Sequence, residues 1–192
     1  VFLFPNFLKR EWYNKNMNTE KQIKSDSMLS GKDTSECKVT FYGGVGWVTG
    51  ANFLLENVVS GEETSTKILV DCGMFQGGEN ADSMNREPFH YNPSEIDYLI
   101  ITHAHADHAK PGHKHVLATQ QTIDIMKIRY ENNCAEVFQA IEFNEKLNIN
   151  DLSLTFFPAG HILGSAQVLI SYQSSRYLIT GDYKTKEDSS CQ

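Results

Sequence analysis

The chain has 192 residues, a formal net charge of −7 at pH 7 and 40% hydrophobic residues. This length supports one domain with a substantial core. The acidity argues against tight nucleic-acid binding by this chain alone, because nucleic-acid binders normally present a basic surface. The four cysteines are widely spaced and form no CxxC pair, which excludes a zinc ribbon and a dense disulfide framework. No apolar run approaches the length of a membrane span, so we expect a cytoplasmic protein without membrane contact.

The first part of the chain predicts a polar leader followed by strands. Residues 9–37 are rich in Lys, Asn, Ser, Thr, Asp and Glu. We therefore expect residues 1–37 to be a disordered or non-native leader and residues 38–192 to form the domain. Short apolar runs bounded by turns predict strands at Val39–Tyr42, Asn52–Glu56, Lys67–Asp71 and Ile96–Thr102. Residues 57–66 are expected to be a hairpin loop, and residues 74–95 an irregular connection with one helical turn near Asn80–Asn85.

The second part combines one helix with further strands. Thr119 is a suitable N-cap for a helix over Gln120–Glu131, in which Ile123, Met126 and Tyr130 have the spacing of a core-facing side. A tight turn is expected at residues 150–151. Strands are expected at Val116–Ala118, Lys146–Ile149, Leu152–Phe157, Gln167–Ser171 and Arg176–Thr180. The pattern predicts an α/β (α+β) fold dominated by strands.

The most informative segment is Thr102–His108, which reads THAHADH and follows an apolar run; we call it the histidine loop. His103 and His105 alternate, so they point the same way on an extended backbone. Asp107 and His108 need a turn to face the same point. Imidazoles suit zinc and a carboxylate suits a harder or shared position, so the layout suits two neighbouring metal ions. A merely His-rich surface loop is disfavoured, because three of the seven histidines fall in this short segment.

Two further candidates lie downstream. His161 and Asp182 each follow an apolar run, at the place where a strand end can hold a ligand. A glycine precedes each of them and lets backbone approach a site closely. Either residue alone would be unremarkable, but together with the histidine loop both become candidate ligands.

These motifs resemble those of a known family. The metal-binding positions of the metallo-β-lactamase superfamily are matched here by His103, His105, Asp107, His108, His161 and Asp182. Asp71 matches the superfamily's early aspartate, which orients the histidine loop from behind the ligands. Residues 42–56 and 69–77 resemble RNA-cleaving members of its β-CASP nucleic-acid-processing branch. Residues 103–112, 158–167 and 181–184 instead look like the ligase-associated DNA exonucleases and related mRNA 3′-end processing factors.

The two halves thus look like different subfamilies joined at the histidine loop. A sister lineage that retains both features would explain this, and so would recombination or splicing within the shared motif. The resemblance covers about residues 38–192 and leaves both explanations open.

The resemblance implies an αββα sandwich that is incomplete at its C-terminus. In β-CASP nucleases a large second domain follows the aspartate matched by Asp182, and the chain then returns with another ligating histidine. We therefore expect a truncated N-terminal part that lacks the β-CASP domain. An unfinished sheet leaves an exposed edge, which a second copy of the chain or a completing partner would cover.

The resemblance also implies two Zn²⁺ ions and a nuclease. Asp107, His108 and Asp182 would be catalytic, and a metal-bound hydroxide would attack a phosphodiester bond of DNA or RNA. The second metal site would have one ligand fewer than the family supplies. By the resemblance, the first ion takes His103, His105 and His161, the second takes Asp107 and His108, and Asp182 bridges them. No substrate-binding residue is indicated.

Two other functions stay open at this stage. A small-substrate hydrolase acting on a thioester or lactone would share the metal core, because a fold does not fix a substrate. A catalytically silent metal-binding fragment would fit the negative charge and the missing ligand. The amino-acid sequence of residues 158–167 and 180–184 favours the nuclease group.

Other polar residues have a functional and a structural interpretation. His113 and His115 could contact phosphate, but we expect them to be exposed loop histidines. Lys184 and Lys186 lie either in a solvated tail or against a phosphate backbone. Ser165 either places a hydroxyl near substrate or forms the turn into the next strand.

Overall fold

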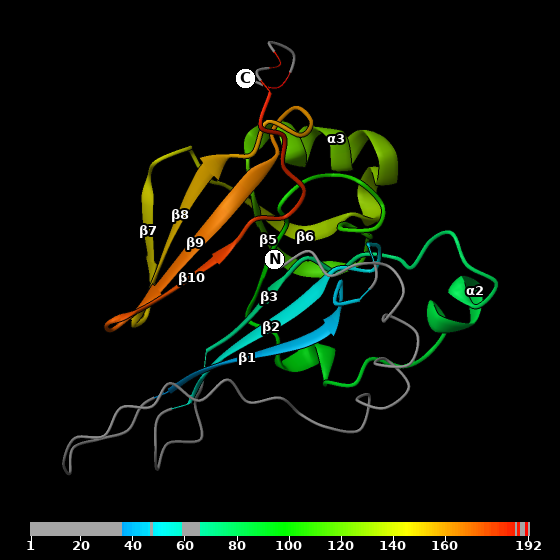
Figure 1. Ribbon diagram of the computed structural model, residues 1–192, viewed down its shortest axis with the longest axis horizontal. Helices are drawn as coiled ribbons and strands as arrows, with labels where there is room; N and C mark the ends of the chain where they lie inside the picture. Colours follow the sequence, from blue (N-terminus) through cyan, green and yellow to red (C-terminus); the bar gives the residue numbers. More distant parts are fainter. Residues whose placement is uncertain (1–35, 47, 59–65, 187, 189–190, 192) are drawn as a thin grey trace.

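The computed structural model describes residues 36–46, 48–58, 66–186, 188 and 191. Two β-sheets pack face to face, and one long helix lies against the outer side of the first sheet (Figure 1). The predicted leader at residues 1–37 lies outside the described residues apart from its last two, which belong to the first strand. Most of the predicted hairpin loop at residues 57–66 also lies outside the described residues.

The first sheet has six strands in the order β1-β2-β3-β4-β5-β6. Strands β1 to β3 pair antiparallel, whereas β3 to β6 pair parallel. Because parallel strands end at one edge, the loops after β3 and β4 leave the sheet side by side. The strands are β1 (Glu36–Gly43), β2 (Asn52–Val58), β3 (Lys67–Val70), β4 (Tyr98–Ile100), β5 (His113–Ala118) and β6 (Ala135–Ala140).

The second sheet is an antiparallel meander in the order β10-β9-β8-β7. Alternate residues of β8 and β9 are buried, as expected when one face of a sheet meets a core. That core includes Ile100 and Leu117 from the first sheet and Phe156 and Ile170 from the second. The strands are β7 (Lys146–Ile149), β8 (Leu152–Pro158), β9 (Ala166–Tyr172) and β10 (Ser175–Ile179).

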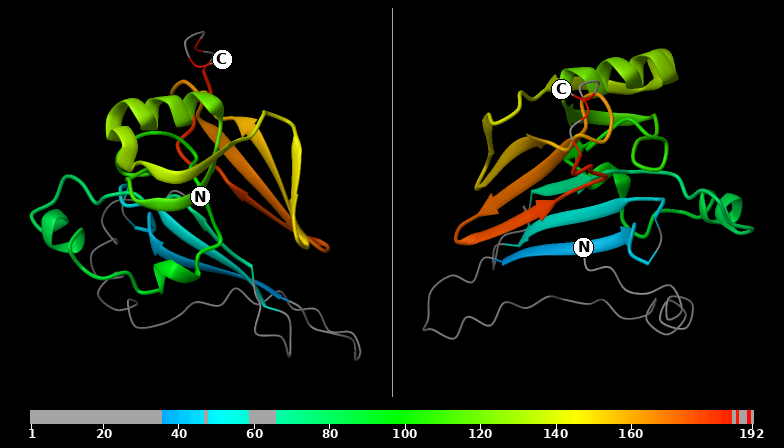
Figure 2. Two further views of the ribbon diagram at one scale, coloured as in Figure 1. Left: turned by 180° about the vertical axis from the view of Figure 1, so that it is seen from behind. Right: turned by 45° about the horizontal axis from the view of Figure 1, so that its top comes forward.

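Helix α3 (Gln120–Tyr130) covers part of the outer face of the first sheet. Its buried side chains Ile123 and Met126 pack against β4 and β5 residues. The Thr119 side chain accepts a hydrogen bond from Thr122 N and so provides the predicted N-cap. Both views of Figure 2 place the loop between β8 and β9 beside this helix. No helix among the described residues is long and apolar enough to cross a membrane.

The predicted strands and helix are largely confirmed, although several ends differ: β1 begins at Glu36, β2 extends to Val58 into the predicted hairpin loop, and β4 is only Tyr98–Ile100. Two differences are larger. Strand β5 begins at His113 rather than at Val116, and the sequence pattern does not predict β6 at all. No residue of β6 is fully buried, so its apolar alternation is weak and gives little strand signal. The predicted helical turn is α2 (Ala81–Met84), and short 3₁₀ helices lie at Pro93–Glu95 and Glu131–Asn133.

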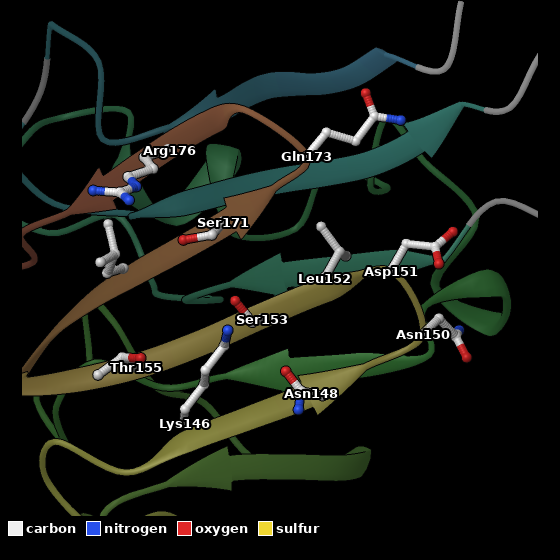
Figure 3. Close-up of a pocket in the computed structure, with 11 residues that line it drawn as sticks. Lys146, Asn148, Asn150, Asp151, Leu152, Ser153, Thr155, Ser171, Gln173 and Arg176 are labelled. Carbon is white, nitrogen blue, oxygen red and sulfur yellow. The ribbon is translucent and has the colours of Figure 1, made fainter. Parts of the chain in front are cut away.

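The outer face of the second sheet carries polar side chains (Figure 3). Strand register places Asn148, Ser153, Ser171 and Arg176 in one row across the four strands. A shallow hollow of about 560 Å³ lies over this row. None of its lining residues belongs to the histidine loop, so this hollow is separate from the candidate metal centre.

Candidate metal centre

A buried carboxylate anchors the histidine loop. Asp71 directly follows β3, is fully buried and has a φ of 59°. Its Oδ1 accepts a hydrogen bond from Thr102 N and its Oδ2 accepts one from Thr102 Oγ1, both at 2.8 Å. Its Oδ2 also lies 2.7 Å from His108 Nδ1. The His108 imidazole therefore donates from Nδ1 and presents Nε2 to the opposite side.

Three imidazoles and one carboxylate converge in front of this loop. His105 Nδ1 lies 3.1 Å from His103 Nε2 and 3.2 Å from His161 Nε2. His161 Nε2 lies 3.5 Å from Asp182 Oδ2. One ligand atom from each of these four residues lies within 4.8 Å of all the others. Because His161 follows β8 and Asp182 follows β10, both sheets contribute to the cluster.

A second group adjoins the first through the same carboxylate. His108 Nε2 lies 4.0 Å from Asp107 Oδ2 and 3.6 Å from Asp182 Oδ1. Asp182 thus turns one oxygen toward His161 and the other toward His108. Among the described residues, His108 Nε2 is buried and finds no hydrogen-bond partner. A buried polar atom of this kind calls for an explanation, and a cation placed between these groups would supply its partner.

The donor set fits zinc. Ligand atoms about 2.1 Å from a tetrahedral ion lie about 3.4 Å apart. The distances of 3.1, 3.2 and 3.5 Å within the first group are close to that spacing. Imidazole nitrogens with a shared carboxylate are also donors that zinc accepts. The residues present can therefore hold divalent metal.

Burial and neighbouring charges set the protonation of the histidines. Burial, with the nearby His108, His105 and His161, lowers the pKa of His103 to about 2. Burial also lowers the pKa of His161, although the Asp182 charge opposes it. Burial alone would lower the pKa of His108, but Asp71, Asp182 and Asp107 together raise it. His103 is therefore neutral at pH 7, which is the form of imidazole that binds metal.

Backbone contacts from the first sheet support the histidine loop from below. Ala51 N donates to Asp107 O at 3.0 Å, and Cys72 N donates to His108 O at 2.8 Å. Gly73 lies so close that a Cβ there would fall 1.6 Å from Asp107 O. The sequence motifs do not identify this support, and the glycine at position 73 is its only sequence signal.

The His161 loop, residues 159–165 between β8 and β9, is shaped by its own serine. The Ser165 hydroxyl accepts hydrogen bonds from His161 N at 3.0 Å and from Ile162 N at 3.2 Å. Ser165 is buried, and Gly164 before it has a φ of 77°. Of the two interpretations of Ser165, the structural one is confirmed.

Four other residues considered in the sequence are not among the candidate ligands. The expectation of exposed loop histidines is wrong, because His113 and His115 belong to β5 and their Nε2 atoms are buried. The hydrophobic pattern placed the start of this strand at Val116, because the first three residues of β5 are polar. Lys184 and Lys186 are exposed, and Lys184 Nζ lies 3.2 Å from Asp188 Oδ2.

The fold is a β-sandwich that carries a cluster able to hold a metal ion, and comparisons with known proteins agree with this fold. The sequence profile of the metallo-beta-lactamase superfamily matches residues 52–110, which include Asp71 and the histidine loop. Ribonuclease TTHA0252 of Thermus thermophilus is 31% identical over 174 residues, covering 78% of this chain and 38% of that protein. Endoribonuclease ysh1 of Aspergillus fumigatus is 30% identical over 156 residues, covering 63% of this chain and 18% of that protein.

A solved structure supports the fold. A metallo-beta-lactamase HARLDQ-motif mutant of Cronobacter sakazakii gives a TM-score of 0.50 at 15% identity, covering 73% of this chain and 58% of that chain. Residues 52–110, with the histidine loop at their end, are thus similar to the metallo-β-lactamase superfamily. It spans 38% of the Thermus protein and 18% of the Aspergillus protein.

Proposed function

We propose that this chain is the metal-binding part of a zinc-dependent nuclease that cleaves phosphodiester bonds of RNA. The observation that carries the proposal is the convergence of imidazole and carboxylate atoms from both sheets within 4.8 Å. The names of the relatives, a ribonuclease and an endoribonuclease, support RNA over DNA as the substrate.

The geometry supports a ligand assignment with two ions. His103, His105 and His161 would hold the first, and Asp107 with His108 would hold the second. Asp182 would give one oxygen to each, as its two short contacts suggest. Divalent ions bound there would activate water and neutralise charge that develops on the phosphate.

Hydrogen bonds with neighbouring residues orient the imidazoles toward the site. Asp71 accepts the proton of His108 Nδ1, so the Nε2 lone pair faces the site. The Thr102 hydroxyl donates to Asp71 and lies 3.2 Å from His103 Nδ1, so it is placed to accept from that nitrogen. The Asp107 carboxylate is partly exposed, and it is placed to hold a proton of the attacking water.

The net charge bears on substrate binding, and the state of the cysteines bears on the location of such an enzyme. Divalent ions would supply positive charge at a site in a chain whose net charge is −7. All four cysteines are free thiols, which supports a reducing, cytoplasmic location.

Metal analysis and cleavage assays test the proposal together. We expect the purified chain to contain about two zinc ions by elemental mass spectrometry. Labelled single-stranded RNA should be cleaved faster than single-stranded DNA or a thioester. The variants Asp107→Asn and Asp107→Ala/His108→Ala should lose cleavage, while circular dichroism reports whether they stay folded.

Asp124→Asn is a matched control, because Asp124 is an exposed carboxylate on α3. It should leave metal content and cleavage unchanged. A wild-type chain without zinc, or cleavage that survives in the double variant, would overturn the proposal. A thioester cleaved faster than RNA would favour the small-substrate alternative instead.

A further inference from the structure

The start of helix α3 holds the His161 loop. Thr119 Oγ1 donates to Gly164 O at 2.7 Å, and Thr122 Oγ1 donates to the same carbonyl at 3.1 Å. Both threonines are buried. Contact is so close that a Cβ on Gly164 would fall 2.7 Å from Thr119 Oγ1. Two hydroxyls thus fix a carbonyl that lies three residues after His161.

The end of the same helix holds the histidine loop. Arg129 Nη1 donates to Ala104 O, the carbonyl between the two alternating histidines. Tyr130 Oη donates to Ala109 O at 2.7 Å, directly after His108. These two bonds hold the carbonyls on either side of residues 105–108, which include His105, Asp107 and His108.

Helix α3 connects these two sets of contacts and is packed on the first sheet. Its eleven residues span about 16 Å at 1.5 Å per residue. Ile123 and Met126 are buried against the first sheet, so the helix cannot slide along it without losing packing. A backbone bond also links the start of β9, just after the His161 loop, to the histidine loop, from Ala166 N to Thr102 O at 2.8 Å. That single bond fixes one point, whereas α3 adds contacts on either side.

We propose that α3 is a positioning brace for the metal centre. By holding the His161 loop at one end and the histidine loop at the other, it sets the distance between ligands that come from different sheets. Metal sites lose affinity when ligands stray by about 0.5 Å, so such a brace favours metal binding. The positioning residues are Thr119, Thr122, Arg129 and Tyr130. This inference rests on the proposed function, because it presumes that the cluster binds metal.

Thr122→Val and Tyr130→Phe test the brace with the least damage to the helix. Each removes one hydroxyl and keeps nearly the same shape, and neither residue is the N-cap. Matched controls remove the same groups elsewhere. Tyr177→Phe deletes a hydroxyl that donates to Cys37 O, and Thr155→Val deletes one on the outer face of the second sheet.

Cobalt and zinc titrations give the readout. Co²⁺ absorption reports ligand geometry, competition with a chromophoric chelator gives zinc affinity, and urea unfolding in chelator gives metal-free stability. We expect the double variant Thr122→Val/Tyr130→Phe to bind zinc about 10- to 100-fold more weakly and to change the Co²⁺ spectrum. The control pair should keep the wild-type affinity and spectrum.

The outcomes separate the brace from the proposed function. If wild-type protein binds two ions and the double variant binds them with unchanged affinity and spectrum, the brace is refuted and the metal centre stands. A loss of metal-free stability without a change in affinity or spectrum also refutes it, because that marks a purely structural helix contact. If wild-type protein takes up no metal, both proposals fall.

Discussion

The two sheets contribute to the metal centre in different ways. From the first sheet, His103 and His108 are only 0% and 4% exposed. His108 contacts Asp71 directly, and His103 is linked to it through the Thr102 hydroxyl. From the second sheet, the side chains of His161 and Asp182 are 22% and 37% exposed. His103 and His108, the first half of the comparison, are therefore built into the core before any metal binds, whereas His161 and Asp182, the second half, approach it from the rim. His105 and Asp107 lie between these extremes, because both are half-buried.

This difference in burial predicts that the two halves affect different properties, namely the stability of the fold and the affinity for metal. A change in the first half should damage the packing of the sheet as well as the site, because buried polar groups lose their partners. A change in the second half should weaken metal binding and leave the metal-free fold nearly intact. Substitutions in the two halves can test this division directly.

Asp71→Asn should have the largest effect on stability. The amide removes a charge that accepts from Thr102 and His108, and its NH₂ group faces donors instead of accepting from them. We expect the free energy of unfolding, measured by urea in chelator, to fall by about 3 kcal/mol. Asp82→Asn on α2 is the exposed control and should change it by less than about 0.5 kcal/mol. Equal losses in the two variants would contradict the anchoring role.

Gly73→Ala should have the second-largest effect on stability. Its methyl group would overlap Asp107 O, so the histidine loop must shift or the sheet must open. We expect a loss of about 2 kcal/mol in unfolding free energy together with weaker zinc binding. Gly77→Ala is a useful contrast, since Gly77 has a φ of 75° and a methyl group added there would meet no atom within 4 Å. It should cost about 1 kcal/mol of stability and leave zinc affinity unchanged.

Asp182→Asn should weaken metal binding strongly and change stability little. The residue lies on the rim and contacts two imidazoles, so the metal-free protein should lose less than about 0.5 kcal/mol of stability. Zinc affinity should fall about 10- to 100-fold, with the second ion lost first, because the shared carboxylate is gone. Chelator competition measures both. A variant that keeps two tightly bound ions would show that Asp182 is not shared.

Local patterns predicted most of the fold and the candidate ligands. The strict alternation in β8 and β9 and the Thr119 cap carry their own signals, so these elements were predictable. His161 and Asp182 could be grouped with the histidine loop because family motifs relate them. Their distances to one another depend on how two sheets pack, which no local pattern contains.

The supporting residues were not predictable for the same reason. Thr122 and Tyr130 look like ordinary helix residues, and only their tertiary neighbours reveal bonds to the two ligand loops. Strand β6 lies at the edge of its sheet and buries little, so its residues carry no clear period. His113 was misplaced because polar residues at a strand start resemble a loop.

The smallest expected effect on stability concerns His113, a partly buried histidine outside the metal centre. Burial lowers its pKa from 6.5 to about 4, although a hydrogen bond with the Lys110 backbone opposes this; the Lys110 charge acts in the same direction as burial. The folded state therefore binds this proton more weakly than the unfolded state, so stability is full above pH 6.5 and falls as the pH drops toward 4. For this partly buried group we expect a loss of about 1 kcal/mol between pH 7 and pH 5.

The variant His113→Phe isolates that contribution from the other histidines. It removes the titrating group and keeps a flat ring in a place where Nε2 finds no hydrogen-bond partner among the described residues. Urea unfolding in chelator at pH 5, 6 and 7 should show a shallower decline for the variant than for wild type. His103, whose pKa is also lowered by burial, still titrates in both proteins, so some decline remains. Identical slopes would mean that His113 gains a proton without penalty and contributes nothing to the acid sensitivity.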